Sequence, residues 1–255
     1  KLNVRTMRKY LFFIVTMVAV ALVSCNNREK EVYPEFEPFI FEATDGSTYE
    51  VMITYQRIAN MWDREVFAKI EWQNYTNSFA GYDTEVVSND DGFIRMDLDA
   101  MAKHIVDEYS GYAEESEGPM CCYSMDQSAF FVRNNSVLCY ETIVESYTGG
   151  AHGGQTLWYE CFDLNTGSLY DFSYLFEGEW SDDLRSLVYD KLVAEYTILI
   201  DAPELLPIAG SVMLSDEGVV LVYQPYEVAS YSEGIISVEI TDEELEQMAV
   251  PLLWE

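Results

Sequence analysis

Basic residues are scarce in this 255-residue sequence. The chain has 14 lysines and arginines against 45 aspartates and glutamates, so its formal net charge is −31 at pH 7. Such acidity disfavours nucleic acid and anionic membrane surfaces as partners, because both carry negative charge themselves. It favours a basic partner or bound cations, although an acidic solvated surface without a ligand accounts for the charge as well.

Catalytic motifs are also missing. The sequence contains no H-E-x-x-H, no G-x-S-x-G and no phosphate-binding P-loop. Its two histidines, His104 and His152, lie far apart and do not form an H-x-x-x-H pair. We therefore expect no catalytic residue, no bound metal and no cofactor.

Long apolar runs are limited to one stretch, Tyr10 to Val23. Arg8 and Lys9 precede it, and Leu22-Val23-Ser24-Cys25 ends it. A positive start, a short apolar run and a small residue before the cleavage site are typical of a secretory signal, whereas a membrane span needs about 20 apolar residues. The final tetrapeptide also resembles the bacterial lipobox, in which the cysteine is lipidated. An ordinary signal peptide with an incidental cysteine is the alternative.

These features predict how the protein is exported and how it is attached to a membrane. Residues 1–24 are expected to be a signal peptide of the lipoprotein type, with Cys25 as the lipid anchor. Two or more acyl chains hold a protein stably on a membrane. The polar, proline-containing residues 25–38 are expected to form a tether. We therefore expect an exported protein that is lipid-anchored to a bacterial membrane, on its periplasmic or surface face.

Four other cysteines remain, and an exported compartment permits disulfides. Cys139 and Cys161 are equidistant from Gly150, so antiparallel strands on either side of that residue would place the two cysteines opposite each other. This spacing raises the hypothesis of a cross-strand disulfide, with two buried free thiols as the alternative. Cys121 and Cys122 are expected to be structural, because neither a C-x-x-C motif nor a nearby histidine accompanies them.

Glycine is concentrated in Tyr147-Thr148-Gly149-Gly150-Ala151-His152-Gly153-Gly154, the glycine loop. Because glycine enters positive-φ conformations at little cost, this run predicts a tight loop. His152 has three interpretations: it bonds the backbone of the loop, contacts a ligand, or acts as a catalytic base. Tyr147 and Tyr226 either close the core or present their rings as a contact surface.

Further segments follow the loop in a recognisable order: the strand Trp158–Phe162, Phe162-Asp163-Leu164-Asn165-Thr166-Gly167, Asp171-Phe172-Ser173-Tyr174-Leu175-Phe176, and Gln224-Pro225-Tyr226-Glu227-Val228-Ala229 with Gly234. Together with the glycine loop, this order resembles the C-terminal domain shared by the anti-sigma factor RsiV and the peptidoglycan deacetylase PdaC, a domain of unknown function family. The resemblance is strongest from Tyr147 to about Met248.

The resemblance implies a binding role. The RsiV domain binds lysozyme, and the PdaC domain is a non-catalytic accessory to an envelope enzyme. By resemblance, this chain is a non-catalytic cell-envelope lipoprotein that binds a lysozyme-like basic protein or cell-wall glycan such as peptidoglycan. RsiV has an anti-sigma segment and a transmembrane helix where this chain has a signal peptide, so anti-sigma activity is not implied. The candidate binding residues are Tyr147, Gly149, Gly150, His152, Gly153 and Tyr226.

Two other functions stay open. Glu141, Glu145, Glu160 and Asp163 flank the glycine loop, and a glycosidase needs only two carboxyl groups at a defined separation. An envelope glycan hydrolase is therefore one alternative, although nearby acids are expected by chance in so acidic a chain. The other is a structural envelope lipoprotein that recognises another surface component.

Strand patterns in clusters, interrupted by a few helical patterns, predict an α+β fold with a mainly antiparallel sheet and about three packed helices. Residues 39–146 are expected to form an N-terminal α+β half and residues 147–255 the RsiV/PdaC-like C-terminal domain, with a core that both halves are able to share. Turns are expected at Asp45-Gly46-Ser47 and Asn89-Asp90-Asp91-Gly92. Helices are expected where Leu98, Met101, Ala102, Ile105 and Tyr109 form an apolar stripe, after Ser181, and at the capping-box sequence Thr241-Asp242-Glu243-Glu244.

Overall fold

A computed structural model describes residues 32–80, 82, 87–88, 94–95, 97–115, 118, 120–177, 181–248, 250 and 252–253. The expected signal peptide, the Cys25 anchor and the turn at Asn89–Gly92 lie outside these residues. Residues Pro34–Glu255 form one compact unit. No helix in the described part of the chain has the length and apolarity needed to cross a membrane.

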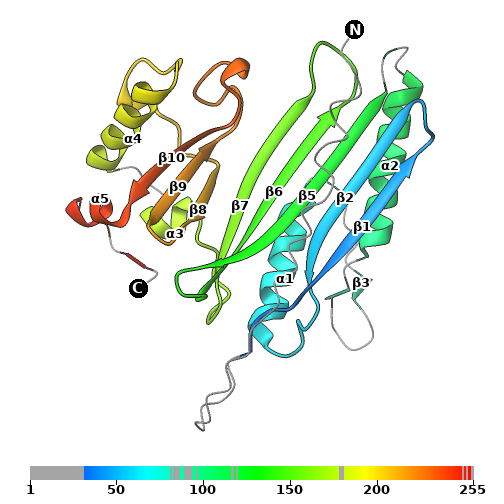
Figure 1. Cartoon of the computed structure of the whole chain (residues 1–255), viewed down its shortest axis with the longest axis horizontal. Coiled ribbons are helices and arrows are strands. Elements are labelled where there is room, and N and C mark those ends of the chain that lie inside the picture. The colour runs from blue at the N-terminus through cyan, green and yellow to red at the C-terminus, as the bar shows by residue number, and fades with distance from the viewer. Residues whose placement is uncertain are drawn as a thin grey trace. The chain divides into compact units, whose positions relative to one another are not determined.

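A five-stranded sheet with the strand order β1-β2-β5-β6-β7 is the largest element of this unit (Figure 1). Its strands are β1 (Phe36–Thr44), β2 (Tyr49–Ile58), β5 (Cys121–Val132), β6 (Val137–Tyr147) and β7 (Gly154–Asp163). All neighbours pair antiparallel except β2 and β5, which are parallel. Parallel neighbours need a long crossover. This crossover contains α1 (Glu65–Ser78), β3 (Val87–Ser88), β4 (Ile94–Arg95) and α2 (Leu98–Glu115).

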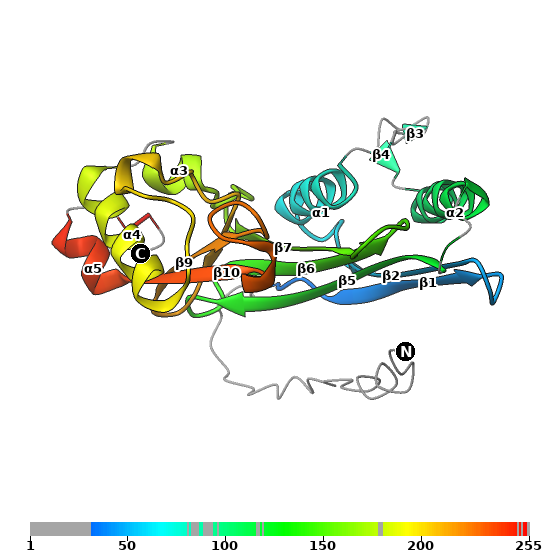
Figure 2. The same cartoon turned by 90° about the horizontal axis from the view of Figure 1, so that it is seen from above.

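The crossover helices α1 and α2 cover one face of the sheet (Figure 2). Side chains alternate across a strand, and Val51, Ile53 and Tyr55 of β2 are buried on the covered face. The apolar stripe of α2 is buried as its spacing predicts, whereas His104 lies off the stripe and is exposed. Residues from Glu65 to Ser78 form α1, which buries Phe67 and Ile70.

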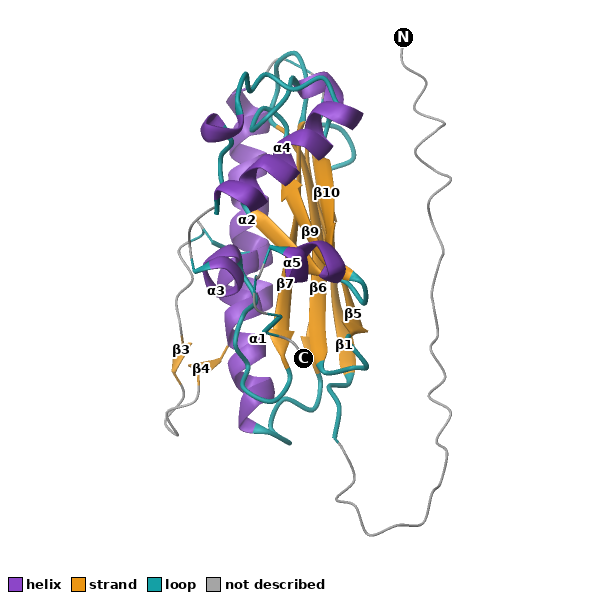
Figure 3. Ribbon diagram, turned by 90° about the vertical axis from the view of Figure 1, so that its left-hand side faces the viewer, coloured by secondary structure: helices purple, strands orange, loops and turns teal. Residues whose placement is uncertain are grey.

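The C-terminal part adds a second, smaller sheet with the order β10-β9-β8. Its elements are α3 (Phe172–Phe176), α4 (Asp182–Glu195), the 3₁₀ helix η2 (Pro203–Leu205), β8 (Ser211–Leu214), β9 (Gly218–Tyr223), the 3₁₀ helix η3 (Tyr231–Glu233), β10 (Ile236–Thr241) and α5 (Asp242–Gln247). Figure 3 shows α1, α2 and α3 on the same side of the strands. One buried cluster joins β6 and β7 to α3, α4, α5 and the small sheet, so the two sheets share a core.

The predicted fold class, α+β with a mainly antiparallel sheet, is confirmed. The described residues contain five α-helices, of which α1, α2 and α4 are the longer three. The Ser181 side chain accepts a hydrogen bond from the Leu184 backbone N–H at the start of α4. Thr241 and Glu244 cap α5 reciprocally, as the capping-box sequence predicts.

Two boundaries from the sequence analysis do not coincide with the structure. Pro34 is buried and β1 begins at Phe36, so the end of the expected tether, residues 25–38, belongs to the fold. The division between residues 39–146 and 147–255 falls inside the β6–β7 hairpin, where Ser146 pairs with Gly154. The family-like signature begins at the glycine loop, but the strand on its far side needs β6 as its hydrogen-bonding partner.

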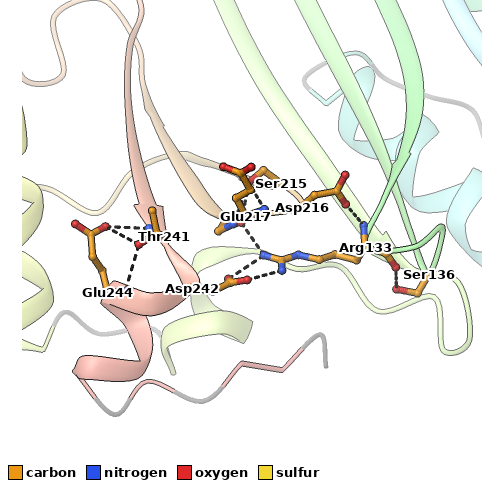
Figure 4. Close-up of polar contacts among 9 residues, drawn as sticks. Arg133, Ser136, Ser215, Asp216, Glu217, Thr241, Asp242 and Glu244 are labelled. Atoms are coloured by element: carbon orange, nitrogen blue, oxygen red, sulfur yellow. Dashed lines mark hydrogen bonds and ion pairs between the residues drawn. The ribbon is translucent and has the colours of Figure 1, made fainter.

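Arg133, in the turn between β5 and β6, ties the large sheet to the small one (Figure 4). Its guanidinium donates from Nη1 to Asp242 Oδ2 at 2.5 Å and from Nη2 to Asp242 Oδ1 at 2.9 Å. Nη2 also donates to the Gly218 carbonyl oxygen at 3.2 Å, and the Arg133 backbone N–H donates to Asp216 Oδ1 at 2.5 Å. A two-pronged guanidinium–carboxylate pair is strong and geometrically specific. It therefore holds the β5–β6 turn against the β8–β9 turn and the start of α5.

Candidate binding site at the glycine loop

The glycine loop connects β6 to β7 and is held by its own backbone. Gly149 and Gly150 have φ angles of 101° and 102°, a region that favours glycine. The Tyr147 hydroxyl donates a 2.9 Å hydrogen bond to the Gly150 carbonyl oxygen. A Cβ on Gly153 would lie 2.7 Å from the Ser146 carbonyl oxygen, so this position has no room for a side chain. The loop is therefore tight, as its composition predicts.

Three rings gather over this loop in a cluster, the aromatic platform, in which His152 and Tyr226 are exposed and Tyr231 is half-buried. The His152 and Tyr231 rings stack with centroids 4.2 Å apart, and the Tyr226 and Tyr231 centroids are 5.5 Å apart. The Tyr231 hydroxyl donates to the Gly153 carbonyl oxygen at 2.9 Å, which ties η3 to the glycine loop. Tyr226 is 64% exposed at a φ of 73°, uncommon for a bulky residue.

The structure agrees with one of the three interpretations of His152, a bond to the backbone of the loop. Its Nδ1 lies 2.9 Å from the Gly153 carbonyl oxygen, so the ring is held by the backbone of the loop. The residue is nevertheless exposed, and its stacked ring remains on the surface. Because this partner is a backbone carbonyl, the bond orients the ring as a rigid surface group. The structure thus places His152 and Tyr226, 74 positions apart in the sequence, in one cluster, while Tyr147 braces the loop.

Tyr231 completes the platform, and sequence reasoning missed it. It lies in a polar stretch, between Ser230 and Ser232, without a periodic pattern that would single it out. The signal available was its place five residues after Tyr226 inside the family-like segment. Only the fold brings that segment against the glycine loop.

The four carboxylates that flank the loop do not converge. Tyr140 pairs with Glu160 and Glu141 pairs with Tyr159 across β6 and β7, so Glu160 lies on the face opposite Glu141. Glu141 and Glu145 share a face but are four strand residues apart, roughly 13 Å. Their carboxyl groups have separate partners, the Tyr159 hydroxyl for Glu141 and the Gln155 amide for Glu145, so they do not form the paired acids that a glycosidase needs.

The Asp163 carboxylate stabilises the turn in which it lies. Its Oδ1 accepts hydrogen bonds from the backbone N–H groups of Asn165 and Thr166 at 2.6 and 2.8 Å, and its Oδ2 accepts one from the Tyr170 hydroxyl. Gly167 follows with a φ of 66°. This segment is a hairpin turn whose carboxylate is occupied by backbone donors.

A disulfide joins Cys139 to Cys161 within the β6–β7 hairpin. The register pairs the two residues directly, as their equal distance from Gly150 suggests. Both are buried in the core shared by the two sheets, and the Leu214 backbone N–H donates to Cys161 Sγ at 3.3 Å. The disulfide therefore stiffens the stem that carries the glycine loop.

The two remaining cysteines of the described residues are free thiols at the start of β5. Cys121 is buried and Cys122 is half-buried. Burial and then the neighbouring carboxylate of Glu50 raise the pKa of the Cys122 thiol, which lowers its reactivity. Both cysteines therefore contribute to the structure of the sheet.

The part of the chain that carries the platform is poor in positively charged residues. After Arg133 the sequence contains Arg185 and Lys191 and no other lysine or arginine. Lys191 binds the Glu244 carboxylate within its own region, at 2.8 Å. Glu227 directly follows Tyr226 and is exposed. A basic partner would therefore meet little like-charge repulsion here.

The fold defines an α+β unit in which a large, mainly antiparallel sheet carries a small antiparallel sheet at one end. Residues 195–243 match the family described as "Protein of unknown function (DUF3298)". This segment contains β8, β9 and β10 together with Tyr226 and Tyr231. No curated protein matches the chain.

Two solved structures resemble this fold. One is a DUF3298 family member from Bacteroides fragilis NCTC 9343, with a TM-score of 0.64 and 16% identity, over 84% of this chain and 92% of the other. The second is a DUF3298 family protein from Pseudomonas aeruginosa PAO1, with a TM-score of 0.57 and 15% identity, over 84% of this chain and 94% of the other. At such identities the likeness concerns the fold alone.

Proposed function

We propose that this protein is a non-catalytic cell-envelope lipoprotein whose aromatic platform binds a basic protein of the lysozyme type. The observation that carries the proposal is the aromatic platform, in which the exposed His152 and Tyr226 rings flank the half-buried Tyr231 ring and Tyr231 is bonded to the glycine loop. Rigid amphipathic rings provide contact area at a low cost in conformational entropy, and tyrosine is enriched at binding hot spots.

Three further observations support this proposal. The net charge of −31 complements a basic partner and would accelerate association at low salt. The loop and the Tyr226 segment resemble the lysozyme-binding domain of RsiV. The Leu22–Cys25 sequence resembles a lipobox, which supports export and attachment to a bacterial membrane.

Calorimetry with lysozyme as the probe tests the proposal. We expect binding that weakens at least tenfold between 0.05 and 0.5 M NaCl, because salt screens exposed charges. His152→Ala and Tyr226→Ala should each weaken binding by about 1–3 kcal/mol, the cost of truncating a hot-spot ring. Tyr174→Ala is the matched control, because Tyr174 is also an exposed tyrosine but lies in α3, which follows the other end of β7.

Several outcomes would overturn the proposal. Absence of lysozyme binding at low salt would do so, including a result in which isolated peptidoglycan binds instead. Equal affinities for the wild type and both platform variants would remove the platform as the site. Release of reducing ends or acetate from peptidoglycan would refute the non-catalytic assignment and favour the envelope hydrolase.

A further inference from the structure

A cavity of about 620 Å³ lies between the C-terminal end of α1, β7 and the segments that precede α3 and β8. This volume is within the range of small-molecule sites. Its lining mixes polar and apolar side chains, including Asn77, Trp158, Glu160, Phe172, Ile208 and Ser211. No lysine, arginine or histidine is among the described residues that line it.

Glu160 is the unusual member of this lining. It is 4% exposed, and its Oε1 accepts a 2.5 Å hydrogen bond from Asn77 Nδ2. Its Oε2 is buried and meets no donor with hydrogen-bond geometry among the described residues, and the nearby Trp158 side chain acts on the carboxyl only by lowering its pKa. A buried acceptor without a donor costs about 1–3 kcal/mol, and more when it is charged. A ligand that supplies a donor at this atom would offset that cost.

The groups around Glu160 offer little compensation. Tyr140 of β6, Tyr55 of β2 and Glu71 of α1 lie close enough to interact electrostatically with one another or with Glu160, and the Tyr140 hydroxyl is also buried without a partner. Asp171 also belongs to the lining, but its carboxylate caps α3 by accepting a hydrogen bond from the Tyr174 backbone N–H. Burial raises the pKa of Glu160 to about 7, against the opposing effect of the Asn77 and Trp158 side chains. No lysine, arginine or histidine in the described lining of the cavity balances the Glu160 carboxyl.

We propose that this cavity binds an organic cation, namely a primary ammonium or guanidinium group carried on an apolar or aromatic body. The cationic head donates a hydrogen bond to Glu160 Oε2, and the apolar body packs against Trp158 and Phe172. An ammonium group has three donors and no acceptor, which matches the unpaired carboxyl oxygen of Glu160 in a lining without basic side chains. The indole ring of Trp158 also attracts a cation that lies over its face.

The cavity is separate from the aromatic platform. Glu160 is six residues along β7 from Gly154, and its side chain lies on the face of the sheet that α1 covers. The ligand is therefore a free amine or a lysine or arginine side chain of a protein that docks at this place. These two sources share the same chemistry at Glu160.

Benzylamine, with benzyl alcohol as its neutral counterpart, tests the proposal by calorimetry or NMR titration. At pH 8 we expect benzylamine to bind the wild type at least tenfold more tightly than benzyl alcohol does. Between pH 8 and pH 6 its affinity should fall about tenfold, because a carboxyl with a pKa of about 7 becomes largely protonated while the amine stays charged. This comparison needs no variant.

Glu160→Gln should reduce benzylamine binding at least tenfold while Glu145→Gln, an exposed acid on the opposite face, leaves it unchanged. Equal binding of the amine and the alcohol, or binding that does not change with pH, would overturn the proposal even if Glu160→Gln fails to fold. Displacement of benzylamine by the peptide acetyl-Gly-Lys-Gly-amide would support the proposal and identify a protein side chain as a suitable occupant. Retention of benzylamine against this peptide would support a free amine as the ligand.

Discussion

Glu71 of α1 and Glu160 of β7 are buried, form no ion pair among the described residues, and make stability depend on pH. Glu71 is 1% exposed, and its Oε2 accepts a 2.8 Å hydrogen bond from the Ile58 backbone N–H. Burial raises its pKa from 4.5 to about 7, against the opposing effects of that bond and of the Arg57 charge. The folded protein therefore keeps a proton that the unfolded chain releases above pH 4.5. The contribution of Glu71 to the free energy of unfolding is therefore largest at low pH and is lost as the pH rises towards 7.

Glu71→Gln should remove this dependence, because glutamine fills similar space and does not ionise. From pH 5 to pH 8 we expect the wild type to lose stability relative to the variant by on the order of 3 kcal/mol. Urea unfolding at four pH values measures the difference. Glu42→Gln, at an exposed position in β1, should parallel the wild type. Parallel curves for the wild type and Glu71→Gln would contradict the prediction.

Gly153 is a position where the close approach of backbone excludes a side chain. In Gly153→Ala the added Cβ would meet the Ser146 carbonyl oxygen at 2.7 Å, so the loop must shift. We expect a loss of about 1–3 kcal/mol of unfolding free energy, typical of overpacking, together with weaker lysozyme binding. Gly111→Ala in α2 has open space around it and should gain up to about 1 kcal/mol from helix propensity. Similar behaviour of the two variants in thermal and urea unfolding would refute this account.

At the scale of elements, the β5–β6 turn is held to the small sheet through Arg133 and Asp242. Both side chains are largely shielded, with exposed fractions of 12% and 27%. Arg133→Ala removes both prongs of the pair and the bond to the Gly218 carbonyl oxygen. We expect a loss of about 2–3 kcal/mol, since hydrogen bonds to charged groups are the stronger class. Urea unfolding at pH 7 measures this loss.

A surface ion pair provides the matched control for Arg133. Glu37 pairs with Arg57 at 3.0 Å, but the two side chains are 64% and 40% exposed. Glu37→Gln should therefore change stability by no more than about 0.5 kcal/mol. If Arg133→Ala costs no more than Glu37→Gln, the turn does not depend on this contact.

At the scale of the whole molecule, the net charge of −31 should oppose compaction through repulsion between carboxylates. Raising NaCl from 0.05 to 0.5 M shortens the screening length from about 14 to about 4 Å and relieves that repulsion. We expect the free energy of unfolding at pH 7 to rise with salt, measured by urea unfolding. At pH 4.5, where many carboxylates are protonated, the rise should be smaller. A fall in stability with salt at pH 7 would contradict this expectation.

Short-range signals predicted the elements whose causes are local. The Ser181 cap and the Thr241–Glu244 capping box mark helix starts because each side chain bonds backbone only three residues away. The α2 stripe and the fold class follow from periodicity, which reports burial on one face. The parallel pairing of β2 with β5 could not be predicted from local sequence patterns, because the whole crossover separates the two strands in the chain.

The features of the candidate site also fall into two groups, those with local causes and those that depend on the fold. The sequence alone was sufficient for the acidity of the chain, the tight glycine loop and the opposition of Cys139 and Cys161 about Gly150, because these depend on composition, local φ preference and symmetric spacing. Only the tertiary structure shows that Tyr231 stacks on His152. It also shows that Glu160 lines a cavity on the sheet face opposite to Glu141. Strand alternation and contacts between distant segments decide which side chains meet, and neither is visible in residues that are neighbours in the chain.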